Sequence, residues 1–180
     1  LKIDVIPRPN MIKYGNVDCH IPSKLKIITN EKLVNEARFL KEYLETIIRN
    51  NIPIILEKNN SVKSKGDFCV NIFSCNQKKS IEEYYLSTSS SSIDISSPSK
   101  IGAMHAIETL KQLFFLSGKN EPMSKQINLS NLIIPKVSIE DYPIFSHRGL
   151  LLDCSRHFFS VETIKKYIDL LSFYKMNVLH

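Results

Sequence analysis

The sequence has little cysteine and little glycine, and each scarcity excludes a class of protein. Four cysteines, Cys19, Cys69, Cys75 and Cys154, are too few and too dispersed for a disulfide scaffold, so we predict small buried side chains with free thiols. Cys154 and His157 have the spacing of metal ligands, but no second pair accompanies them, so no metal site is predicted. With five glycines in all, the chain has no glycine-rich phosphate loop.

Long apolar runs are also missing. The chain contains no stretch of about 18 or more apolar residues, so no membrane span is predicted. It opens LeuLysIleAspValIlePro, without the basic head, apolar run and small-residue cleavage site of a secretory signal. A mature exported protein would open in the same way, so this opening leaves the compartment undecided.

Charge is only moderately unbalanced: 24 Lys and Arg face 18 Asp and Glu, which gives a formal net charge of +6. The lysines are scattered and form no basic stripe interleaved with stacking aromatics, so no nucleic-acid partner is expected. A solvated surface is favoured, and a basic binding domain for an anionic polymer is a weaker alternative. The hydrophobic content of 43% is enough for a core in one or two domains.

The first 143 residues carry the patterns of several strands and two helices. Asn30 and Ser99 are N-cap residues, and Leu33, Ala37 and Leu40 follow Asn30 on one helical face. We predict strands at 24–29, 52–57 (an edge strand or strand start, because it contains proline), 67–73, 83–97 (a hairpin with a serine-rich turn) and 131–141, helices at 30–49 and 99–115, and a loop at 116–130.

This order of elements predicts an α+β fold, with a mainly antiparallel sheet and two helices on one face. No βαβ alternation is expected before residue 147. We place a domain boundary near residue 143, which gives an α+β domain at 1–143 and a second unit at 144–180.

The second unit has the pattern of a strand, a loop, a helix and a strand. Leu150 to Leu152 form the continuous apolar run of a strand that is buried on both faces. Ser160 is an N-cap, Lys175 stands at the C-terminal end of the helix, and an extended apolar run restarts after it. A βαβ unit needs further strands and layers around it, so we expect the first units of a larger α/β domain.

The same stretch carries a resemblance. HisArgGlyLeuLeuLeuAsp-x-SerArgHisPhe, followed by a helix and LysMetAsnVal-x-His, resembles the start of the catalytic barrel in glycoside hydrolase family 20, the β-N-acetylhexosaminidases. Upstream, GlyAlaMetHisAlaIleGluThrLeuLysGlnLeu is similar to the second helix of the α+β domain that many members carry ahead of the barrel. The resemblance implies that residues 144–180 are the first strand, helix and second strand of a truncated (β/α)8 barrel. It also implies an exported (periplasmic, cell-surface or extracellular) enzyme.

The family removes terminal β-linked N-acetylglucosamine or N-acetylgalactosamine from glycans by substrate assistance, so the expected partner is such a glycan. The acetamido oxygen of the sugar attacks the anomeric carbon, an Asp orients the acetamido group, and a neighbouring Glu protonates the leaving oxygen. That Asp-Glu pair is expected beyond residue 180, and Glu140 with Asp141 precedes the barrel and is interpreted as surface or linker. We therefore expect no catalytic residue in this chain, no activity from it alone, and no cofactor.

Five residues are candidates for the site. The resemblance implies that Arg148 reaches the hydroxyls of the sugar, as a planar guanidinium with several fixed donors can. On the residues alone, an arginine at a strand start is more often an ion-pair residue. Asp153, Arg156 and His157 follow the first strand on the catalytic side of any barrel, where they either buttress the site or form a structural network at the start of the helix. His180 would be the first His of the family's His-x-His segment.

A non-enzymatic hypothesis stays open beside this one. In it, the chain is a self-sufficient α+β accessory module, and residues 147–180 are a docking tail for the rest of a barrel or for another copy. A stand-alone module should cover Leu150 to Leu152 and Val178 to Leu179, whereas a truncated barrel would leave them exposed, with self-association through the exposed barrel strands.

Overall fold

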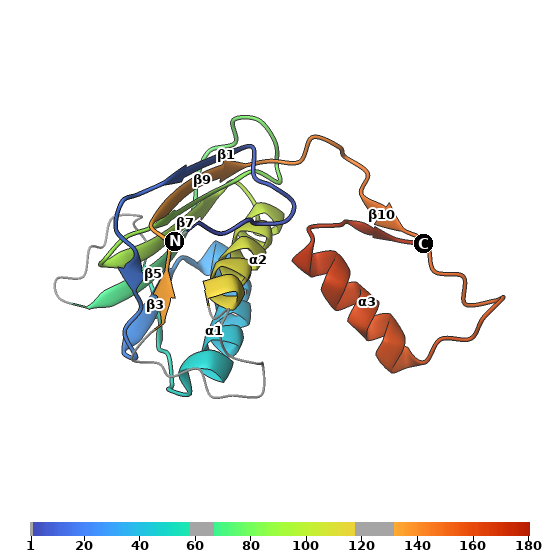
Figure 1. Cartoon of the computed structure of the whole chain (residues 1–180), viewed down its shortest axis with the longest axis horizontal. Helices are drawn as coiled ribbons and strands as arrows, with labels where there is room; N and C mark the ends of the chain where they lie inside the picture. Colours follow the sequence, from blue (N-terminus) through green and yellow to red (C-terminus); the bar gives the residue numbers. More distant parts are fainter. Residues whose placement is uncertain (1, 58–66, 118–131) are drawn as a thin grey trace.

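The computed structural model describes residues 2–57, 67–117 and 132–180. It has two lobes (Figure 1). In the larger lobe, two helices cover one face of a seven-stranded sheet, and in the smaller lobe a single helix lies beside a pair of short strands. The predicted loop at 116–130 lies almost wholly outside the described residues.

The large sheet is mixed. From one edge to the other, its strands are β1 (Met11–Tyr14), β9 (Val137–Asp141), β6 (Tyr84–Thr88), β7 (Ser92–Ser97), β5 (Phe68–Ser74), β3 (Leu25–Thr29) and β4 (Ile54–Leu56). Neighbours are antiparallel from β1 to β7 and parallel from β7 to β4. The predicted α+β class is confirmed, although the sheet is half parallel instead of mainly antiparallel. The predicted hairpin is β6 with β7, and the predicted strand at 52–57 contains β4, an edge strand that begins directly after Pro53.

The parallel half of the sheet arises from a crossover that the sequence interpretation did not contain. Strand β3, the helix α1 (Val34–Ile48) and strand β4 form a parallel βαβ unit. The expectation that no such alternation precedes residue 147 is therefore wrong. A helix of 15 residues is long enough to return the chain to the start of a parallel neighbour.

The larger lobe also contains a separate pair of two-residue strands. β2 (Cys19–His20) pairs with β8 (Ile133–Ile134) in an antiparallel ladder. The predicted strand at 131–141 is thus two strands, β8 and β9, which are separated at Pro135 because proline has no amide hydrogen for a ladder. Strands β1 and β2 lie in a stretch that the sequence did not mark as extended.

The core lies between the sheet and the helices. Asn30 accepts a hydrogen bond from the Lys32 amide, as a cap should, and the left-handed Arg49 ends α1. Helix α2 (Lys100–Ser117) packs so closely on the sheet that a Cβ at Gly102 would lie 2.3 Å from the Glu83 carbonyl oxygen. The side chains that join helices and sheet are almost fully buried: Ile27, Ala37, Leu40, Leu44, Val70, Ile72, Leu86, Ile93, Ala106, Ile107 and Leu110.

The smaller lobe contains β10 (Gly149–Leu150), α3 (Val161–Phe173) and β11 (Val178–Leu179), and the two strands are parallel. The predicted order of strand, helix and strand is confirmed, and Ser160 caps α3 by accepting from the Thr163 amide. Helix α3 has no buried residue, and Leu151 is 64% exposed. The apolar surface of this lobe is therefore open to solvent.

All four cysteines are free, as predicted. Cys19 and Cys69 are buried and Cys75 is partly so, but Cys154 is exposed in the loop after β10, where the lobe offers no core to enclose it. Over the described ranges, no helix combines the length and apolar character that crossing a membrane requires, and no group of three or more His, Cys, Asp or Glu is placed to hold a metal ion.

Candidate functional site

Arg148 lies where the two lobes meet, directly before β10. Its Nε donates to the Lys175 carbonyl oxygen (2.8 Å), its Nη1 to the Phe145 carbonyl oxygen (2.7 Å), and its Nη2 to Glu82 Oε2. Glu82 belongs to the larger lobe, and the Arg148 side chain is 14% exposed. Each guanidinium nitrogen thus donates to a group of this chain, and the side chain ties the lobes together.

Asp141, the last residue of β9, joins four further groups at the same junction. Its Oδ2 accepts from Tyr84 Oη (2.9 Å) and Lys175 Nζ (3.2 Å), and its Oδ1 accepts from the backbone amide (3.1 Å) and Nδ2 (2.9 Å) of Asn10. Tyr84 Oη also lies 2.7 Å from Thr109 Oγ1 on α2. The carboxylate is therefore fully occupied by hydrogen bonds and one ion pair. We call Glu82, Tyr84, Asp141, Arg148 and Lys175 the junction network.

Burial shifts the pKa values of three side chains at the junction of the lobes. Burial lowers the pKa of Lys175, and the charge of Asp141 opposes that effect. Burial and the charge of Asp141 raise the pKa of Tyr84 well above its ordinary value. Burial also lowers the pKa of His105 to about 4, against the opposing charge of Glu82. The His105 Nε2 atom lies 3.8 Å from Glu82 Oε2, so near neutral pH a neutral imidazole faces a carboxylate there.

Helix α2 makes a second set of contacts across the junction. The Gln112 side chain accepts from the Ile6 amide (2.8 Å) and donates to the carbonyl oxygens of Ile6 (2.6 Å) and Phe173 (3.2 Å). Ser172 Oγ on α3 donates to Glu108 Oε1 (3.2 Å). One amide thus holds the amino-terminal segment and the end of α3 against the same helix.

A cavity of about 320 Å³ lies beside the junction network. It is also lined by Pro7, Arg8, Tyr142, Pro143, Ile144 and Phe145. The charged groups of the network are already paired with one another, so they hold the lobes together and are not free to receive a ligand.

The loop after β10 is built around Asp153. Its Oδ1 accepts from the amides of Ser155 (2.9 Å) and Arg156 (3.0 Å), and its Oδ2 lies 3.1 Å from Arg156 Nε. Asp153 and Arg156 thus form an ion pair, and the Arg156 side chain is 90% exposed. His157 is exposed and meets Phe159 edge to face at 4.9 Å. Asp153 therefore fixes the loop backbone and leaves the guanidinium in solvent.

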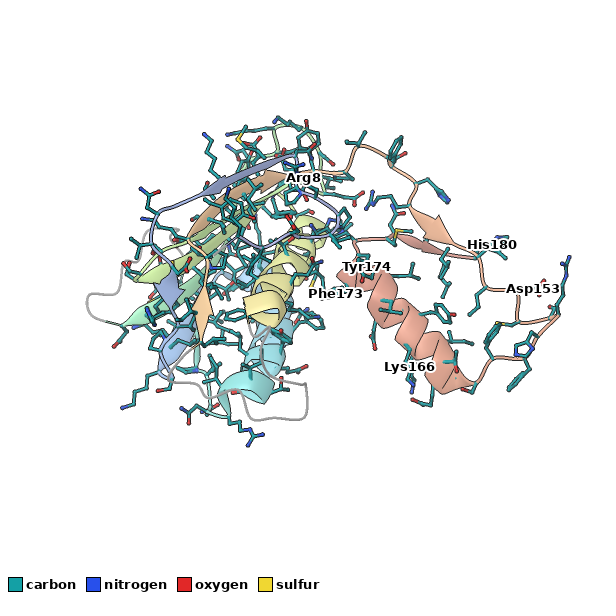
Figure 2. All side chains as sticks on the ribbon, viewed as in Figure 1. Arg8, Asp153, Lys166, Phe173, Tyr174 and His180 are labelled. Carbon is teal, nitrogen blue, oxygen red and sulfur yellow. The ribbon has the colours of Figure 1, made fainter. Side chains whose placement is uncertain are left out.

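His180 lies at the same edge as this loop. Its amide donates to the Leu150 carbonyl oxygen (2.8 Å), and its carbonyl oxygen accepts from the Leu152 amide (2.7 Å). Because β10 and β11 are parallel, their carboxyl ends share one edge, and Figure 2 shows Asp153 and His180 on the side of the smaller lobe away from the large sheet. The structure brings the loop and His180 together and places Arg148 at the opposite, amino-terminal end of β10.

Two members of the junction network, Lys175 and Asp141, were not predicted from the sequence. Lys175 was noticed only as the end of a helix, and its burial depends on Asp141, which is remote in sequence. The interpretation of the acidic pair as surface or linker is wrong for Asp141, which is 8% exposed. The alternation of apolar and polar residues along β9 could have predicted the burial of Asp141, because Val137 and Ile139 are buried and residue 141 points to the same face. Glu140 points the other way.

Two protein-family models together match almost the whole chain. The model described as glycosyl hydrolase family 20, domain 2, matches residues 2–142, and the model of the family 20 catalytic domain matches residues 145–180. The chain belongs to glycosyl hydrolase family 20. The resemblance of its sequence to this family is thereby confirmed, and the α+β lobe corresponds to domain 2.

Family 20 relatives match along the same span. A β-hexosaminidase of Porphyromonas gingivalis is 29% identical over 179 residues, which are 99% of this chain and 22% of that protein. The structure of a family 20 exo-β-N-acetylglucosaminidase from Vibrio harveyi in complex with N-acetylglucosamine has a TM-score of 0.74 and 29% identity, and covers 98% of this chain and 25% of that one. The β-N-acetylhexosaminidase of Streptomyces coelicolor has a TM-score of 0.75 and 27% identity, over 98% of this chain and 34% of its own. The chain thus spans between about a fifth and a third of these relatives.

Proposed function

We propose that this chain serves as the α+β domain and the first barrel units of a β-N-acetylhexosaminidase, which removes terminal β-linked N-acetylglucosamine or N-acetylgalactosamine from glycans. The observation that carries the proposal is the match of its two units, in order, to domain 2 and to the catalytic domain of family 20. The parallel β10 and β11 with α3 between them have the form of the first unit of a (β/α)8 barrel.

The proposed mechanism is substrate-assisted and retaining, and its Asp-Glu pair comes from catalytic-domain residues beyond those of this chain. The chain alone is then inactive for two reasons. It lacks the acid that protonates the leaving oxygen, and two barrel strands cannot close around a sugar. The role of the chain is to fix the position of the first strands.

Two arginines, Arg148 and Arg156, are candidates for the contact with the sugar. The resemblance predicts Arg148 for this contact, a prediction that stays untested, but its guanidinium donates to three groups of this chain at the amino-terminal end of β10. Arg156 is better placed, because active sites of (β/α)8 barrels lie at the carboxyl ends of the strands and its guanidinium there is exposed and held by Asp153. Its fixed donors suit a pair of sugar hydroxyls. We therefore assign the sugar contact to Arg156 and a positioning role to Arg148.

The test is release of 4-nitrophenol from 4-nitrophenyl N-acetyl-β-D-glucosaminide, by this chain and by one extended through the rest of the catalytic domain. Only the extended chain should turn over. In it, Arg156→Ala should lower kcat/KM by about 10- to 100-fold through loss of charged hydrogen bonds, with an unchanged unfolding midpoint. Arg148→Ala should instead lower the unfolding midpoint. Turnover by this chain alone, or silence from both chains, would contradict the proposal.

Export to the periplasm, the cell surface or the medium is part of the proposal, and cell fractionation with an antibody to the chain tests it. A non-catalytic docking module is the weaker candidate, because a self-sufficient module should cover its apolar strands and Leu151 is 64% exposed.

A further inference from the structure

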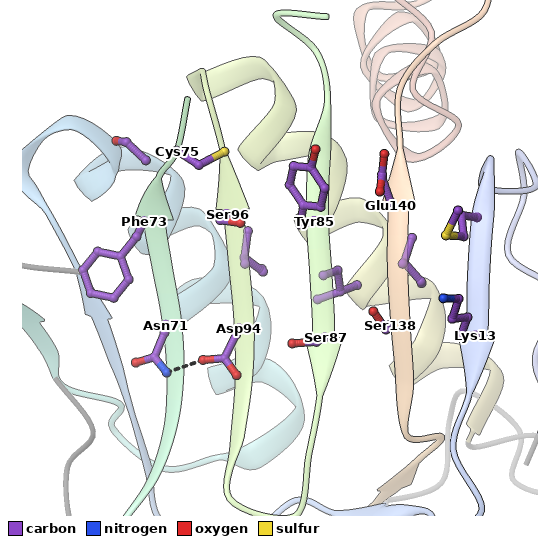
Figure 3. Close-up of a pocket in the computed structure, with 15 residues that line it drawn as sticks. Lys13, Asn71, Phe73, Cys75, Tyr85, Ser87, Asp94, Ser96, Ser138 and Glu140 are labelled. Carbon is purple, nitrogen blue, oxygen red and sulfur yellow. Dashed lines mark hydrogen bonds between the residues drawn. The ribbon is translucent and has the colours of Figure 1, made fainter. Parts of the chain in front are cut away.

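The face of the large sheet that the helices do not cover is hollowed into a groove of about 800 Å³. Strand alternation sends every second side chain of β5, β6, β7 and β9 toward the helices and the intervening ones, among them the buried Phe73, into this groove. The groove crosses five strands, from β5 to β1, and Figure 3 shows the side chains that stand in it.

Strand register arranges these side chains in two rows. The first row, across β5, β7, β6, β9 and β1, consists of Asn71, Asp94, Ser87, Ser138 and Lys13. The second row, on the same strands, consists of Phe73, Ser96, Tyr85, Glu140 and Met11. With strands about 4.8 Å apart, each row is about 19 Å long, and the rows are about 7 Å apart. That area admits more than one ring of an oligosaccharide.

The floor of the groove is rich in hydroxyl groups. Ser87, Ser96 and Ser138 are small, so they leave the hollow open, and each hydroxyl can both donate and accept a hydrogen bond. Tyr85 adds a half-buried aromatic ring, with the Lys78 ammonium 5.2 Å from the ring centroid. At the β5 end of the groove, Asn71 Nδ2 donates to Asp94 Oδ1 (2.6 Å), the dashed line in Figure 3.

Two groove residues have unsatisfied oxygens. Among the described residues, the buried side-chain oxygens that lack a hydrogen-bond partner include Asn71 Oδ1 and Tyr85 Oη. A buried oxygen without a donor costs about 1–3 kcal/mol, and small side-chain rotations would let a hydroxyl-bearing ligand or water supply the missing bond. Both oxygens belong to side chains that line the groove, one in each row.

The residues that line the groove include one basic side chain, Lys13, and two acidic ones, Asp94 and Glu140, which disfavours a polyanion. Beside the groove, Lys79 Nζ lies 2.6 Å from Glu140 Oε1. Apolar surface lies among these polar groups, and Met11, Phe73 and the Tyr85 ring contribute to it. The surface complements a neutral ligand that both donates and accepts hydrogen bonds along its length.

We propose that this groove binds a neutral oligosaccharide, so that the α+β lobe is itself a glycan-binding module. The class of ligand is inferred from the chemistry of the groove, whereas the choice of N-acetylglucosamine units as the probe rests on the proposed function. Tyr85 and the three serines are the central contacts, and the Asn71–Asp94 pair forms one end of the site.

The experiment is a calorimetric titration of the 180-residue chain with tri-N-acetylchitotriose, followed by mapping of ¹⁵N amide shifts. We expect saturable binding with a Kd below about 1 mM, and shift changes on β6, β7 and β9. Tyr85→Ala should weaken binding at least tenfold, and Ser138→Leu, which fills the floor, should do the same. Ser91→Leu, in the exposed hairpin turn outside the groove, is the matched control and should bind as the parent chain does.

Three results would overturn the proposal: no saturable binding at millimolar trisaccharide, shift changes confined to the smaller lobe, or full affinity in both groove variants. Binding of heparin in place of the trisaccharide, lost in modest salt, would also overturn it, because it shows nonspecific charge. Unfolding midpoints in urea identify any variant that fails through instability. Hydrolysis by the extended chain is measured in parallel, so intact hydrolysis without groove binding rejects the groove alone, and groove binding without hydrolysis rejects the proposed function alone.

Discussion

Lys175 Nζ lies 3.2 Å from Asp141 Oδ2, and both side chains are almost fully withdrawn from solvent. The pair joins β9, the last strand of the larger lobe, to the second residue after the end of α3 in the smaller lobe. Lys175 adopts a left-handed backbone conformation, with φ of 59°, which turns the chain from the helix toward β11. The contact therefore fixes the start of β11 as well as the position of the lobe.

Loss of Asp141 should destabilise the chain strongly. Asp141→Ala leaves the Lys175 ammonium buried without its counter-charge, and we expect a loss of about 3–5 kcal/mol in the free energy of unfolding, measured in urea. The control is Asp67→Ala, because Asp67 pairs with Lys26 at 3.0 Å but is 70% exposed, and its loss should cost at most about 1 kcal/mol. Equal effects of the two substitutions would contradict a buried ion pair.

Stability should fall as the pH falls from about 6.5 to about 4, through His105. Burial lowers the pKa of His105 to about 4 in the folded chain, so the unfolded chain binds more protons across this window. The contribution is fully present above about pH 6.5 and is lost by about pH 4, and it amounts to at most about 3 kcal/mol. Glu82, Arg148 and Lys175 are the charged groups that act on the imidazole.

Urea unfolding of the parent chain and of His105→Gln at several pH values checks this prediction. The variant should lose the extra pH dependence between about 6.5 and 4, whereas His147→Gln, at an exposed histidine, should keep it. A pH dependence that is identical in the parent and in His105→Gln would count against the prediction.

Gly102→Ala should destabilise the larger lobe. The added Cβ would lie 2.3 Å from both the Glu83 carbonyl oxygen and Ser97 Oγ, and the Glu83 carbonyl directly precedes β6, so it cannot move away without displacing the strand. We expect a loss of about 1–3 kcal/mol, measured by thermal or urea unfolding. At Gly15 the same change meets only the flexible Lys136 side chain, so Gly15→Ala should cost less. The reverse order would show that α2 can shift away from the strands.

The exposed apolar surface of the smaller lobe should drive self-association of the chain. Leu151 is 64% exposed and Ile168 is 51% exposed. Leu151→Lys and Ile168→Lys should each raise the dissociation constant of the self-associated form about tenfold, as measured by sedimentation equilibrium. Val17→Lys, at a 72% exposed position of the larger lobe, is the control and should change nothing. A parent chain that stays monomeric at all concentrations would refute the prediction.

Local patterns predicted most helices and many strands, because caps and alternation are local signals. The caps at Asn30 and Ser160 lie where the sequence placed them, and the serine-rich hairpin is β6 with β7. The pairing of strands was less predictable. Strand β3 lies between β4 and β5, and both neighbours are parallel to it, which no short pattern in 24–29 specifies.

The candidate site was predictable to the extent that a motif marked it. The motif identified Arg148, Asp153 and Arg156, but it did not separate a guanidinium held at the lobe junction from one exposed at the carboxyl end of β10. That difference depends on Glu82, 66 residues from Arg148 along the chain, and only the folded structure brings the two together.

The position of the junction network has a consequence for the order of assembly. Arg148 stands just ahead of β10 and Lys175 just ahead of β11, and their partners Glu82 and Asp141 belong to the lobe that is synthesised first. Domains generally fold from the amino terminus during synthesis, so the sheet and its two carboxylates are in place when β10 and β11 emerge. The larger lobe thus acts as a template that sets the register of β10 against β11 as the two strands emerge.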